Sequence, residues 1–274
     1  MDKFQNKHVF ITGASAGIGA ALAHEFASQG ARLTLTARRL HLLEGLAQDL
    51  IARGTEVLVE TCDVTQDGDL ERALEKARER FGKVDVVVAN AGFGVVGKLE
   101  NLKLEDYRRQ FETNVFGVLR TIQCSLEDLK QTRGSLVLLG SVAGYISLPN
   151  ASPYAMSKFA IRALADSLWA ELAPYGIAVT LISPGFVESS IRKVDNQGVF
   201  QRASEDPMPP WLLMPASRAA RDIVRAVSRR RRERIVTFHG KIFVTLFRFF
   251  PWLIRLITRF GIKGRNEPSS PAQT

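Results

Sequence analysis

Short apolar runs alternate along the chain with longer stretches in which apolar side chains recur about every 3.6 positions. Several runs are uninterrupted Val, Leu and Ile, a composition typical of strands buried on both faces. The runs predict strands at residues 8–12, 32–36, 56–61, 84–89, 134–139 and 177–182, with a last strand at 234–237. The longer stretches predict helices at residues 18–29, 40–53, 67–81, 104–126 and 153–173.

Strict alternation of strand and helix implies a parallel sheet with right-handed crossovers and helices on both faces. This is an α/β fold of the doubly wound Rossmann type, which binds nucleotides. A length of 274 residues suits one large domain or two small ones. The pattern places a single domain in residues 1–240, an amphipathic extension in 241–265 and a disordered polar end in 266–274.

Composition narrows the class of protein. Hydrophobic residues at 46% and charged residues at 24% exclude a collagen, a coiled coil and a disordered chain. Two cysteines, Cys62 and Cys124, cannot form a four-thiolate zinc site, and they fit a reducing compartment. No metal site is expected. Neither a signal peptide nor an apolar stretch of the roughly 20 residues that span a membrane is recognisable, so we expect a cytoplasmic protein.

The net charge of +9 is unevenly distributed. Fourteen of the 37 basic residues lie between Arg218 and Arg265, where Asp222 and Glu233 are the only acids. The excess positive charge is therefore informative about the binding partner of the C-terminal part and not about the substrate of the main domain.

A glycine-rich turn follows the first predicted strand and precedes the first predicted helix, with the sequence Thr-Gly-Ala-Ser-Ala-Gly-Ile-Gly from Thr12 to Gly19. Gly13 allows a tight turn, Gly17 lets a pyrophosphate approach the backbone, and Gly19 lets helix and strand pack closely. The helix N-terminus offers its N–H groups to the phosphates. In this context the motif predicts a dinucleotide site, although glycine turns also occur without a ligand.

The second predicted strand ends in Arg38 and Arg39, where an acidic residue would usually hold the adenosine ribose. A carboxylate would repel a 2′-phosphate, whereas a guanidinium binds one in bidentate fashion. The pair therefore favours NADP(H), with Arg38 as the first choice. The alternative is two solvated arginines, although positive charge at a helix N-terminus is locally unfavourable.

The chain resembles the short-chain dehydrogenases/reductases over about residues 5–240. The motifs that carry the resemblance stand in order at the ends of predicted strands: Thr12–Gly19, Asp63-Val64, Asn90-Ala91-Gly92, Asn114, Ser141, Tyr154-Ala155-Met156-Ser157-Lys158 and Pro184-Gly185. The stretch that begins at Ser157 and the apolar tail are also similar to 3-ketodihydrosphingosine reductases.

The resemblance implies a catalytic set of Asn114, Ser141, Tyr154 and Lys158. Tyr154 and Lys158 are four residues apart and so project from one helix face. A nearby ammonium stabilises a phenolate, which suits Tyr154 to exchange a proton with the substrate oxygen. Ser141 would bind that oxygen, and Asn114 would support a water chain to Lys158. Alone, Tyr154 would be interpreted as a half-buried aromatic on an amphipathic helix.

The resemblance also implies where the cofactor is held. Asp63 and Val64 would contact adenine, Asn90 would steady the sheet, and Val187 would meet the nicotinamide carboxamide. Ser189 stands where the family usually has threonine. The full set of expected cofactor residues is Gly13, Ser15, Gly17, Ile18, Gly19, Arg38, Arg39, Asp63, Val64, Asn90, Ala91, Gly92, Tyr154, Lys158, Pro184, Gly185, Val187 and Ser189.

Residues 186–215 correspond to a substrate lid in the family. The segment holds Pro207, Pro209, Pro210 and Pro215 together with Trp211. Prolines and apolar side chains suit a loop that orders over a lipophilic ligand. They suit a plain surface connection equally well, and both interpretations stay open.

The C-terminal part departs from the family pattern. Fourteen of the 21 residues in 242–262 are apolar, and Lys241, Arg248, Arg255 and Arg259 would form one stripe on a helix. Such a helix is typical of a membrane interface, where basic side chains reach lipid phosphates. The four arginines of residues 229–232 would add attraction to anionic lipid. The alternatives are an arm buried in a dimer partner and a cap over the protein's own active site.

Together these features predict an NADP(H)-dependent oxidoreductase that interconverts a carbonyl and a secondary alcohol. Its substrate would be a lipophilic small molecule at an anionic membrane surface, such as a 3-keto sphingoid base. The alternatives are a steroid or retinoid dehydrogenase and a non-catalytic NADP(H)-binding membrane sensor. Nucleic-acid binding is not expected, because the residues beside the arginine run are apolar. By analogy with the family we expect a homodimer or homotetramer.

Overall fold

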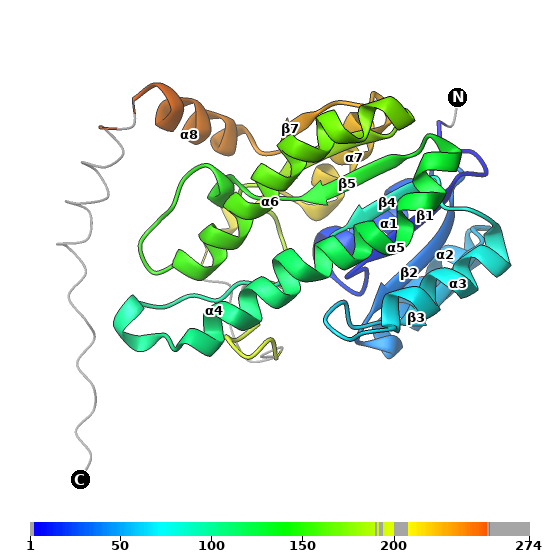
Figure 1. The fold of residues 1–274 in the computed structure, drawn as a ribbon, viewed down its shortest axis with the longest axis horizontal. Coiled ribbons are helices and arrows are strands. Elements are labelled where there is room, and N and C mark those ends of the chain that lie inside the picture. Colours follow the sequence, from blue (N-terminus) through cyan, green and yellow to red (C-terminus); the bar gives the residue numbers. More distant parts are fainter. Residues whose placement is uncertain (1–2, 190, 192–193, 200–207, 251, 253–274) are drawn as a thin grey trace, which may run out of the picture.

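Seven parallel strands form one sheet in the order β3-β2-β1-β4-β5-β6-β7 in the computed structural model, which describes residues 3–189, 191, 194–199, 208–250 and 252 (Figure 1). The strands are β1 (His8–Thr12), β2 (Arg32–Ala37), β3 (Val57–Thr61), β4 (Val86–Ala89), β5 (Ser135–Leu139), β6 (Ala178–Ser183) and β7 (Glu233–Ile235). The first six match the predicted runs closely, and the doubly wound α/β fold is confirmed.

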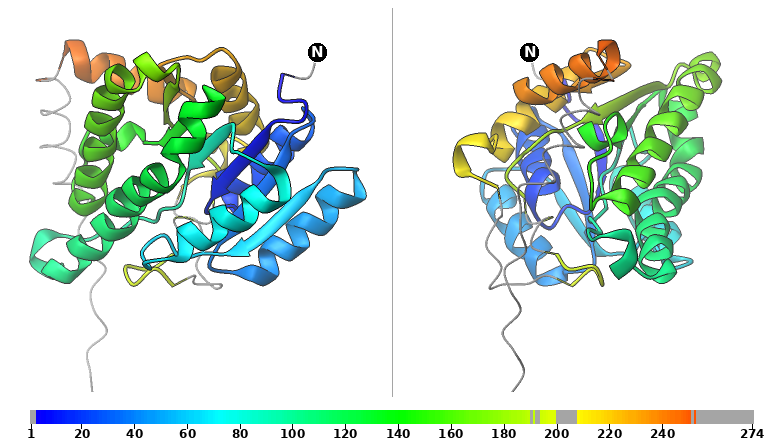
Figure 2. Two further views of the ribbon diagram at one scale, coloured as in Figure 1. Left: turned by 45° about the vertical axis from the view of Figure 1, so that its right-hand side comes forward. Right: turned by 90° about the vertical axis from the view of Figure 1, so that its left-hand side faces the viewer.

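Helices cover both faces of this sheet (Figure 2). They are α1 (Gly17–Ala27), α2 (Leu40–Ala52), α3 (Asp69–Phe81), α4 (Leu104–Phe111), α5 (Gly117–Thr132), α6 (Ser152–Glu171), α7 (Ala216–Ser228) and α8 (Phe238–Phe249). Buried side chains of α1, α2 and α7 form one apolar core, and those of α3, α5 and α6 form the other.

The central strands supply both cores by alternation. In β1, Val9 and Ile11 belong to the α1 side and Phe10 to the α3 side, and all three are fully buried. The same alternation along β4 and β5 explains why their sequences are uninterrupted apolar runs.

Three sequence predictions need correction. The helix predicted at 104–126 is split, because α4 ends at Phe111 and one π-helical turn, Glu112–Phe116, separates it from α5. The last strand ends at Ile235 rather than at Thr237, since Thr237 caps α8 with its side chain. Helix α7 was not predicted, although Ala219, Ile223 and Val227 lie at helical spacing and are buried.

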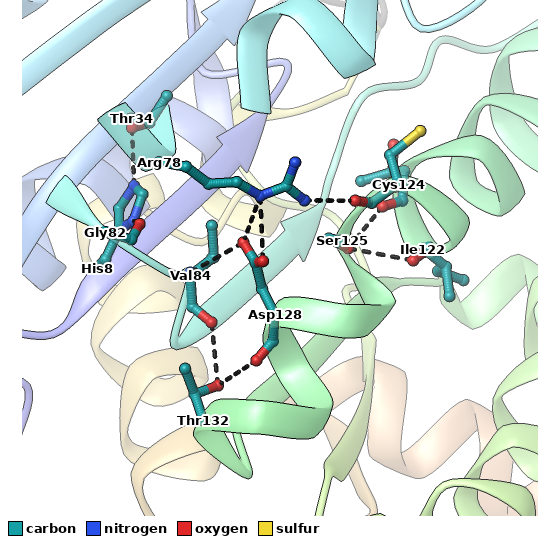
Figure 3. Close-up of polar contacts among 11 residues, drawn as sticks. His8, Thr34, Arg78, Gly82, Val84, Ile122, Cys124, Ser125, Asp128 and Thr132 are labelled. Atoms are coloured by element: carbon teal, nitrogen blue, oxygen red, sulfur yellow. Dashed lines mark hydrogen bonds and ion pairs between the residues drawn. The ribbon is translucent and has the colours of Figure 1, made fainter. Parts of the chain in front are cut away.

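A polar network closes the amino ends of β4 and β5 (Figure 3). The Asp128 carboxylate, 7% exposed, accepts from Arg78 Nε at 3.0 and 3.1 Å and from the Val84 N–H at 3.2 Å. Thr132 Oγ1 donates to the carbonyl of Val84 at 3.0 Å. Because buried polar groups are costly unless paired, these contacts stabilise the edge of the sheet opposite to the one that carries the predicted site.

Helix α8 begins before the predicted boundary between residues 240 and 241 and packs on the main domain. Its Val244 is buried against Tyr145 and Ile146, in the connection that follows β5. Arg255, Arg259 and the predicted disordered end at 266–274 lie outside the described residues. Within the described ranges, the structure has no helix of the length and apolar character that a membrane crossing needs.

Candidate active site

The predicted site residues gather at the carboxyl edge of the sheet. The order of the strands reverses between β1 and β4, and ligands of open α/β sheets bind in the crevice at such a point. The glycine turn follows β1, and the Asn90-Ala91-Gly92 segment follows β4 beside it. The two arginines follow β2, and the segments that begin at Ser141 and Pro184 follow β5 and β6.

The turn after β1 requires glycine at the predicted positions. Gly13 and Gly17 have φ angles of +66° and +57°, which favour glycine. A Cβ on Gly13 would lie 2.8 Å from the Ala91 Cα, and one on Gly19 would collide with the Gly13 carbonyl oxygen. Ala16 supplies no side-chain cap to α1. The backbone is therefore open to a diphosphate, and Ile18 packs its side chain on the core.

Asn90 fastens this turn to the next strand. Its Nδ2 donates to the carbonyls of Thr12 at 2.9 Å and of Gly13 at 3.1 Å. The N–H groups of Asn90 and Ala91 both donate to Thr12 Oγ1 at 3.1 Å. Asn90 thus holds the shape of the glycine turn, as the resemblance implied for a residue that steadies the sheet.

The two arginines after β2 point to different parts of the crevice. Arg39 Nη2 donates to Ser15 Oγ in the glycine turn at 3.1 Å. Arg38 Nη1 lies 4.0 Å from an Asp63 carboxylate oxygen, and its Nη2 donates to the carbonyl of Gly198 at 3.0 Å. Burial and the neighbouring Arg38 charge lower the pKa of Arg39. Two adjacent guanidinium groups at the rim of the turn suit a second phosphate.

The segment after β3 lies next to Arg38. The Asp63 carboxylate accepts from the Thr65 N–H at 3.0 Å and from the Thr65 hydroxyl at 2.8 Å, which fixes the turn. Val64 is buried, and a Cβ on Gly117 would lie 2.5 Å from its Cγ2. Close packing on the start of α5 thus sets the position of these two predicted adenine contacts.

Tyr154 and Lys158 lie on one face of α6, as their spacing predicted. Lys158 Nζ is 5.7 Å from the centroid of the Tyr154 ring and donates to the carbonyl of Leu139 at 2.7 Å. Lys158 is 7% exposed, and burial lowers its pKa to about 8. A cation held at the bottom of the crevice beside a phenol favours the phenolate form of that phenol.

The connection after β5, which begins near Ser141, approaches the same turn of α6 at Gly144. Ser141 is half-buried, and its Oγ accepts from the Ala143 N–H at 3.1 Å. A Cβ on Gly144 would lie 2.7 Å from the Lys158 carbonyl oxygen, so only glycine allows this approach. The Val142 N–H donates to the carbonyl of Pro184 at 2.9 Å. The segments after β5 and β6 are therefore joined beside Lys158.

Asn114 lies in the π-helical turn and is buried. Its Oδ1 accepts from the Phe93 N–H at 3.1 Å, and its Nδ2 donates to the Phe93 carbonyl at 3.0 Å and to Ser157 Oγ at 3.3 Å. Ser157 Oγ in turn donates to the carbonyl of Tyr154 at 2.7 Å. Such turns occur frequently at functional sites. Here the π-helical turn directs the side-chain amide of Asn114 toward the segment after β4 and toward the part of α6 that carries Tyr154.

Sequence reasoning missed the supporting residues. Ser157 is fully buried and links Asn114 to α6, but a serine between Tyr154 and Lys158 gives no local signal of that contact. Gln110 is also fully buried and binds the backbone of Phe93 and Val95. Its position four residues before Asn114 on one helix face was the available hint.

The segment after β6 is held by a bridge outside the main sheet. Val187 is 2% exposed and pairs with Met214, whose N–H donates to the carbonyl of Phe186 at 3.0 Å. A Cβ on Gly185 would collide with Thr237 Oγ1, so the chain passes the start of α8 with no room for a side chain. Ser189 follows and is half-buried.

Part of the predicted lid contacts two connections at the carboxyl edge of the sheet. Asn196 exchanges two hydrogen bonds with the backbone of Val96, at 2.9 and 3.0 Å, and Gly198 binds Arg38. Trp211 is 83% exposed. Residues 190, 192–193 and 200–207, including Pro207, lie outside the described residues. The described part of the segment thus touches the connections after β2 and β4.

A hollow of about 720 Å³ opens beside the start of α6. Leu99, Leu148 and Met156 give it apolar walls, and Tyr107 shares a hydrogen bond with Ser152 at 2.7 Å in its lining. Ser152 and Met156 flank Tyr154 in the sequence. Positions two residues apart do not share a helix face, so the hollow offers apolar surface at the start of α6 rather than on the face that carries Tyr154.

Comparison with known proteins assigns the family. The family model for the short chain dehydrogenases matches residues 7–199. The chain belongs to this family. A relative from Dictyostelium discoideum named dehydrogenase/reductase SDR family protein 7-like is 31% identical over 93% of this chain and 81% of its own length. The 11-beta-hydroxysteroid dehydrogenase A of Sesamum indicum is 36% identical over 73% of this chain. This chain spans 56% of that relative's length.

Solved structures of short-chain dehydrogenases share the fold. A family member from Burkholderia phymatum in complex with NAD has a TM-score of 0.82 and 26% identity, and the match covers 100% of both chains. An alcohol dehydrogenase from Thermococcus sibiricus complexed with 5-hydroxy-NADP has a TM-score of 0.74 and 32% identity, over 84% of this chain and 95% of that one. This short-chain dehydrogenase is thus an oxidoreductase whose structural neighbours bind either nicotinamide dinucleotide.

Proposed function

We propose that this protein is an NADP(H)-dependent oxidoreductase that interconverts a carbonyl and a secondary alcohol on a lipophilic substrate. The observation that carries the proposal is the buried Lys158 ammonium beside the Tyr154 ring. The segments that follow β5 and β6 meet beside it through the hydrogen bond from Val142 to Pro184. A protein that only binds a dinucleotide has no need of this arrangement, so the enzyme is favoured over a non-catalytic sensor.

Four residues of the chain have separate roles in the proposed reaction. The nicotinamide, when bound, supplies or accepts the hydride. Ser141 Oγ hydrogen-bonds the substrate oxygen, and the Tyr154 hydroxyl donates a proton to that oxygen during reduction. Lys158 stabilises the negative charge that remains on the phenol. Asn114 fixes the backbone of Phe93 and, through Ser157, the start of α6.

Preference for NADP(H) rests on the arginine pair. The Arg39 contact with Ser15 brings a guanidinium to the rim of the glycine turn, and Arg38 lies beside it. The 5-hydroxy-NADP held by the Thermococcus sibiricus enzyme is consistent with this choice, whereas the Burkholderia phymatum structure holds NAD. The arginine chemistry of this chain is what favours the phosphorylated form.

A lipophilic substrate is supported by the apolar hollow at the start of α6, the helix that carries Tyr154. Leu99, Leu148 and Met156 would contact a fused ring or an alkyl chain. Relatives in Sesamum indicum and Arabidopsis thaliana carry the name 11-beta-hydroxysteroid dehydrogenase. Hydroxysteroids are therefore the first substrate class to test, ahead of long-chain 3-keto lipids.

We also propose that the C-terminal part brings the enzyme to an anionic membrane surface. On α8, Phe238, Ile242, Phe243 and Phe249 are exposed, and Lys241 and Arg248 lie among them. Exposed aromatic and aliphatic side chains next to basic ones match the requirements of a membrane interface. A lipophilic substrate would be drawn from the same surface.

One assay tests the enzyme proposal. The purified protein is incubated with NADPH and a panel of keto-steroids, long-chain 3-keto lipids and aldehydes, and the absorbance of the reduced cofactor is followed. We expect turnover on at least one lipophilic carbonyl and a loss of about 10²-fold or more after Tyr154→Phe. Tight NADPH binding with no turnover across the panel in either direction would favour the sensor instead.

A further inference from the structure

The first turn of α8 contacts the segment after β6 through His239. His239 Nε2 accepts a hydrogen bond from the Phe186 N–H at 3.1 Å, and the two rings stack with centroids 5.5 Å apart and 25° between their planes. Gly185 leaves no room beside it, because a Cβ there would lie 2.7 Å from His239 Nε2. The sequence assigned no role to this histidine, and the two residues are 53 positions apart.

The backbone of Phe186 is therefore held on both sides. Its N–H is bound by His239, and its carbonyl accepts from the Met214 N–H at 3.0 Å. The next residue is Val187, which is buried and which the resemblance places against the nicotinamide carboxamide. A residue whose N–H and carbonyl are both held has little freedom to turn the following backbone groups away.

His239 is itself anchored by the fold. Thr237 is fully buried, and its Oγ1 accepts from the Gly240 N–H at 3.2 Å, which caps α8. A Cβ on Gly240 would lie 2.9 Å from Val142 Cγ2 in the segment after β5. Val244 then packs on Tyr145. Helix α8 thus contacts both segments of the candidate site, the one after Ser141 and the one after Pro184.

The chemistry of the contact requires a neutral imidazole. Nε2 can accept from Phe186 only when it carries no proton, which leaves the ring hydrogen on Nδ1. Burial lowers the pKa of His239 and so favours the neutral ring. Phenylalanine at this position would keep the stacked ring and lose the acceptor, whereas glutamine would keep an acceptor oxygen and lose the ring.

We propose that His239 is a positioning residue of the cofactor site, whose imidazole fixes the Phe186 amide and thereby orients the Val187 backbone toward the nicotinamide. Helix α8 is then part of the catalytic apparatus as well as a surface element. The cofactor half of this inference rests on the proposed function, but the contact between His239 and Phe186 does not.

The test compares His239→Phe and His239→Gln with Thr245→Ala, a matched change at an exposed position of α8. Hydrogen exchange of the Phe186 amide is measured first, in the protein without cofactor. We expect His239→Phe to speed this exchange about tenfold, the effect of one hydrogen bond. His239→Gln should restore most of the protection, and Thr245→Ala should change nothing.

Cofactor kinetics are measured next on the same proteins. We expect His239→Phe to raise the KM for NADPH about tenfold with a smaller change in kcat, and His239→Gln to recover it. A merely structural role would lower the thermal midpoint of both variants and leave the ratio of KM to kcat unchanged. If His239→Phe does not fold, His239→Gln against wild type decides between these outcomes.

Two results would overturn the positioning role. One is that His239→Phe leaves the exchange rate of the Phe186 amide unchanged. The other is that His239→Gln loses as much protection at this amide as His239→Phe does. Unchanged KM for NADPH despite faster exchange would overturn its link to the cofactor. If the wild-type protein binds no nicotinamide cofactor, the proposed function fails, and the exchange measurement still decides the contact.

Discussion

Arg39, which follows β2 and precedes α2, donates a hydrogen bond from Nη2 to the hydroxyl of Ser15, in the turn after β1, at 3.1 Å. The contact spans the mouth of the crevice between two neighbouring strands. It places positive charge beside the glycine turn, and the Arg38 guanidinium follows in the sequence, 4.0 Å from an Asp63 carboxylate oxygen. The sequence favoured Arg38 as the first choice, but Arg39 is the arginine that touches the glycine turn.

Cofactor preference should follow from this pair of arginines. We expect the protein to bind NADPH at least tenfold more tightly than NADH, because one charge-assisted hydrogen bond contributes about 1.5–3 kcal/mol. Arg39→Ala and Arg38→Ala should each remove much of this difference, and Arg38→Asp should reverse it. Calorimetric titration of both cofactors measures the effect.

The matched control for the cofactor prediction is Arg53→Ala. Arg53 is an exposed arginine beyond the other end of α2, where it pairs with Asp49 at 2.9 Å. Its removal should leave both affinities unchanged. Tighter binding of NADH than of NADPH by the unmodified protein would contradict the assignment.

The architecture was predictable because parallel strands leave a strong local signal. Apolar runs such as residues 84–89 contain the observed strands, here β4 and the two residues before it. Asn90, Ser141 and Pro184 follow the carboxyl ends of such strands, as the sequence predicts. Parallel strands point the same way, so motifs at their ends must meet at one edge. The sequence therefore predicted which residues gather, even though it contained no distances.

The contacts that support the site were not predictable in the same way. Ser157 meets Asn114 across 43 residues, and His239 meets Phe186 across 53. Neither pairing repeats with a helix or strand period. The π-helical turn inserts a residue into a helical pattern whose apolar spacing looks continuous, which is why the sequence predicts one unbroken helix at 104–126.

Catalysis should depend on the hydroxyl of Tyr154. Tyr154→Phe keeps the ring beside Lys158, so we expect cofactor binding to persist while turnover falls by about 10²-fold or more, the usual contribution of general acid catalysis. Tyr175→Phe is the control, since Tyr175 lies past the far end of α6 and is half exposed. The measurement is steady-state turnover on a confirmed substrate, with cofactor affinity measured separately. Near-normal turnover of Tyr154→Phe would rule out the proton-donor role.

The buried Lys158 should make stability depend on pH. Burial lowers its pKa from 10.5 to about 8, so between these values the folded protein binds fewer protons than the unfolded chain. The free energy of unfolding therefore rises with pH through this window, and the cost of the buried charge is fully present below about pH 8. Lys158→Met removes the charge and should flatten the slope, with a difference of about 3 kcal/mol at most.

Urea unfolding of the cofactor-free protein at pH 7, 8, 9 and 10 measures this difference. Lys158→Met should gain most over wild type at pH 7, and the gain should shrink as the pH rises. Removal of the hydrogen bond to the Leu139 carbonyl, by contrast, costs the same at each pH. A gain that stays constant from pH 7 to pH 10 would show that the Lys158 side chain is not desolvated in the folded protein.

Membrane attachment should depend on the outward face of α8. Ending the chain at Gly240 would also remove Val244 from Tyr145 and Ile146, so substitution separates the roles better than truncation. Ile242→Glu with Phe243→Glu places two charges at positions that are 44% and 46% exposed and leaves Val244 in place. We expect this double variant to keep NADPH binding and lose most of its affinity for anionic vesicles.

Apolar burial and charge attraction together set the size of this effect. Each exposed Ile or Phe gains about 1.5–3 kcal/mol on full burial in lipid, and each basic residue near the surface about 1 kcal/mol. Two apolar residues replaced by acids should therefore weaken binding by at least about 10²-fold. Ile51→Glu, at an apolar position of α2 that is 54% exposed, is the control. Vesicle co-sedimentation measures membrane binding, and light scattering measures the mass of the particle. If α8 is instead an arm buried in a partner subunit, the wild-type protein does not bind vesicles and the double variant has a lower mass. Wild-type protein that stays in the supernatant with anionic lipid at low salt would contradict the membrane proposal.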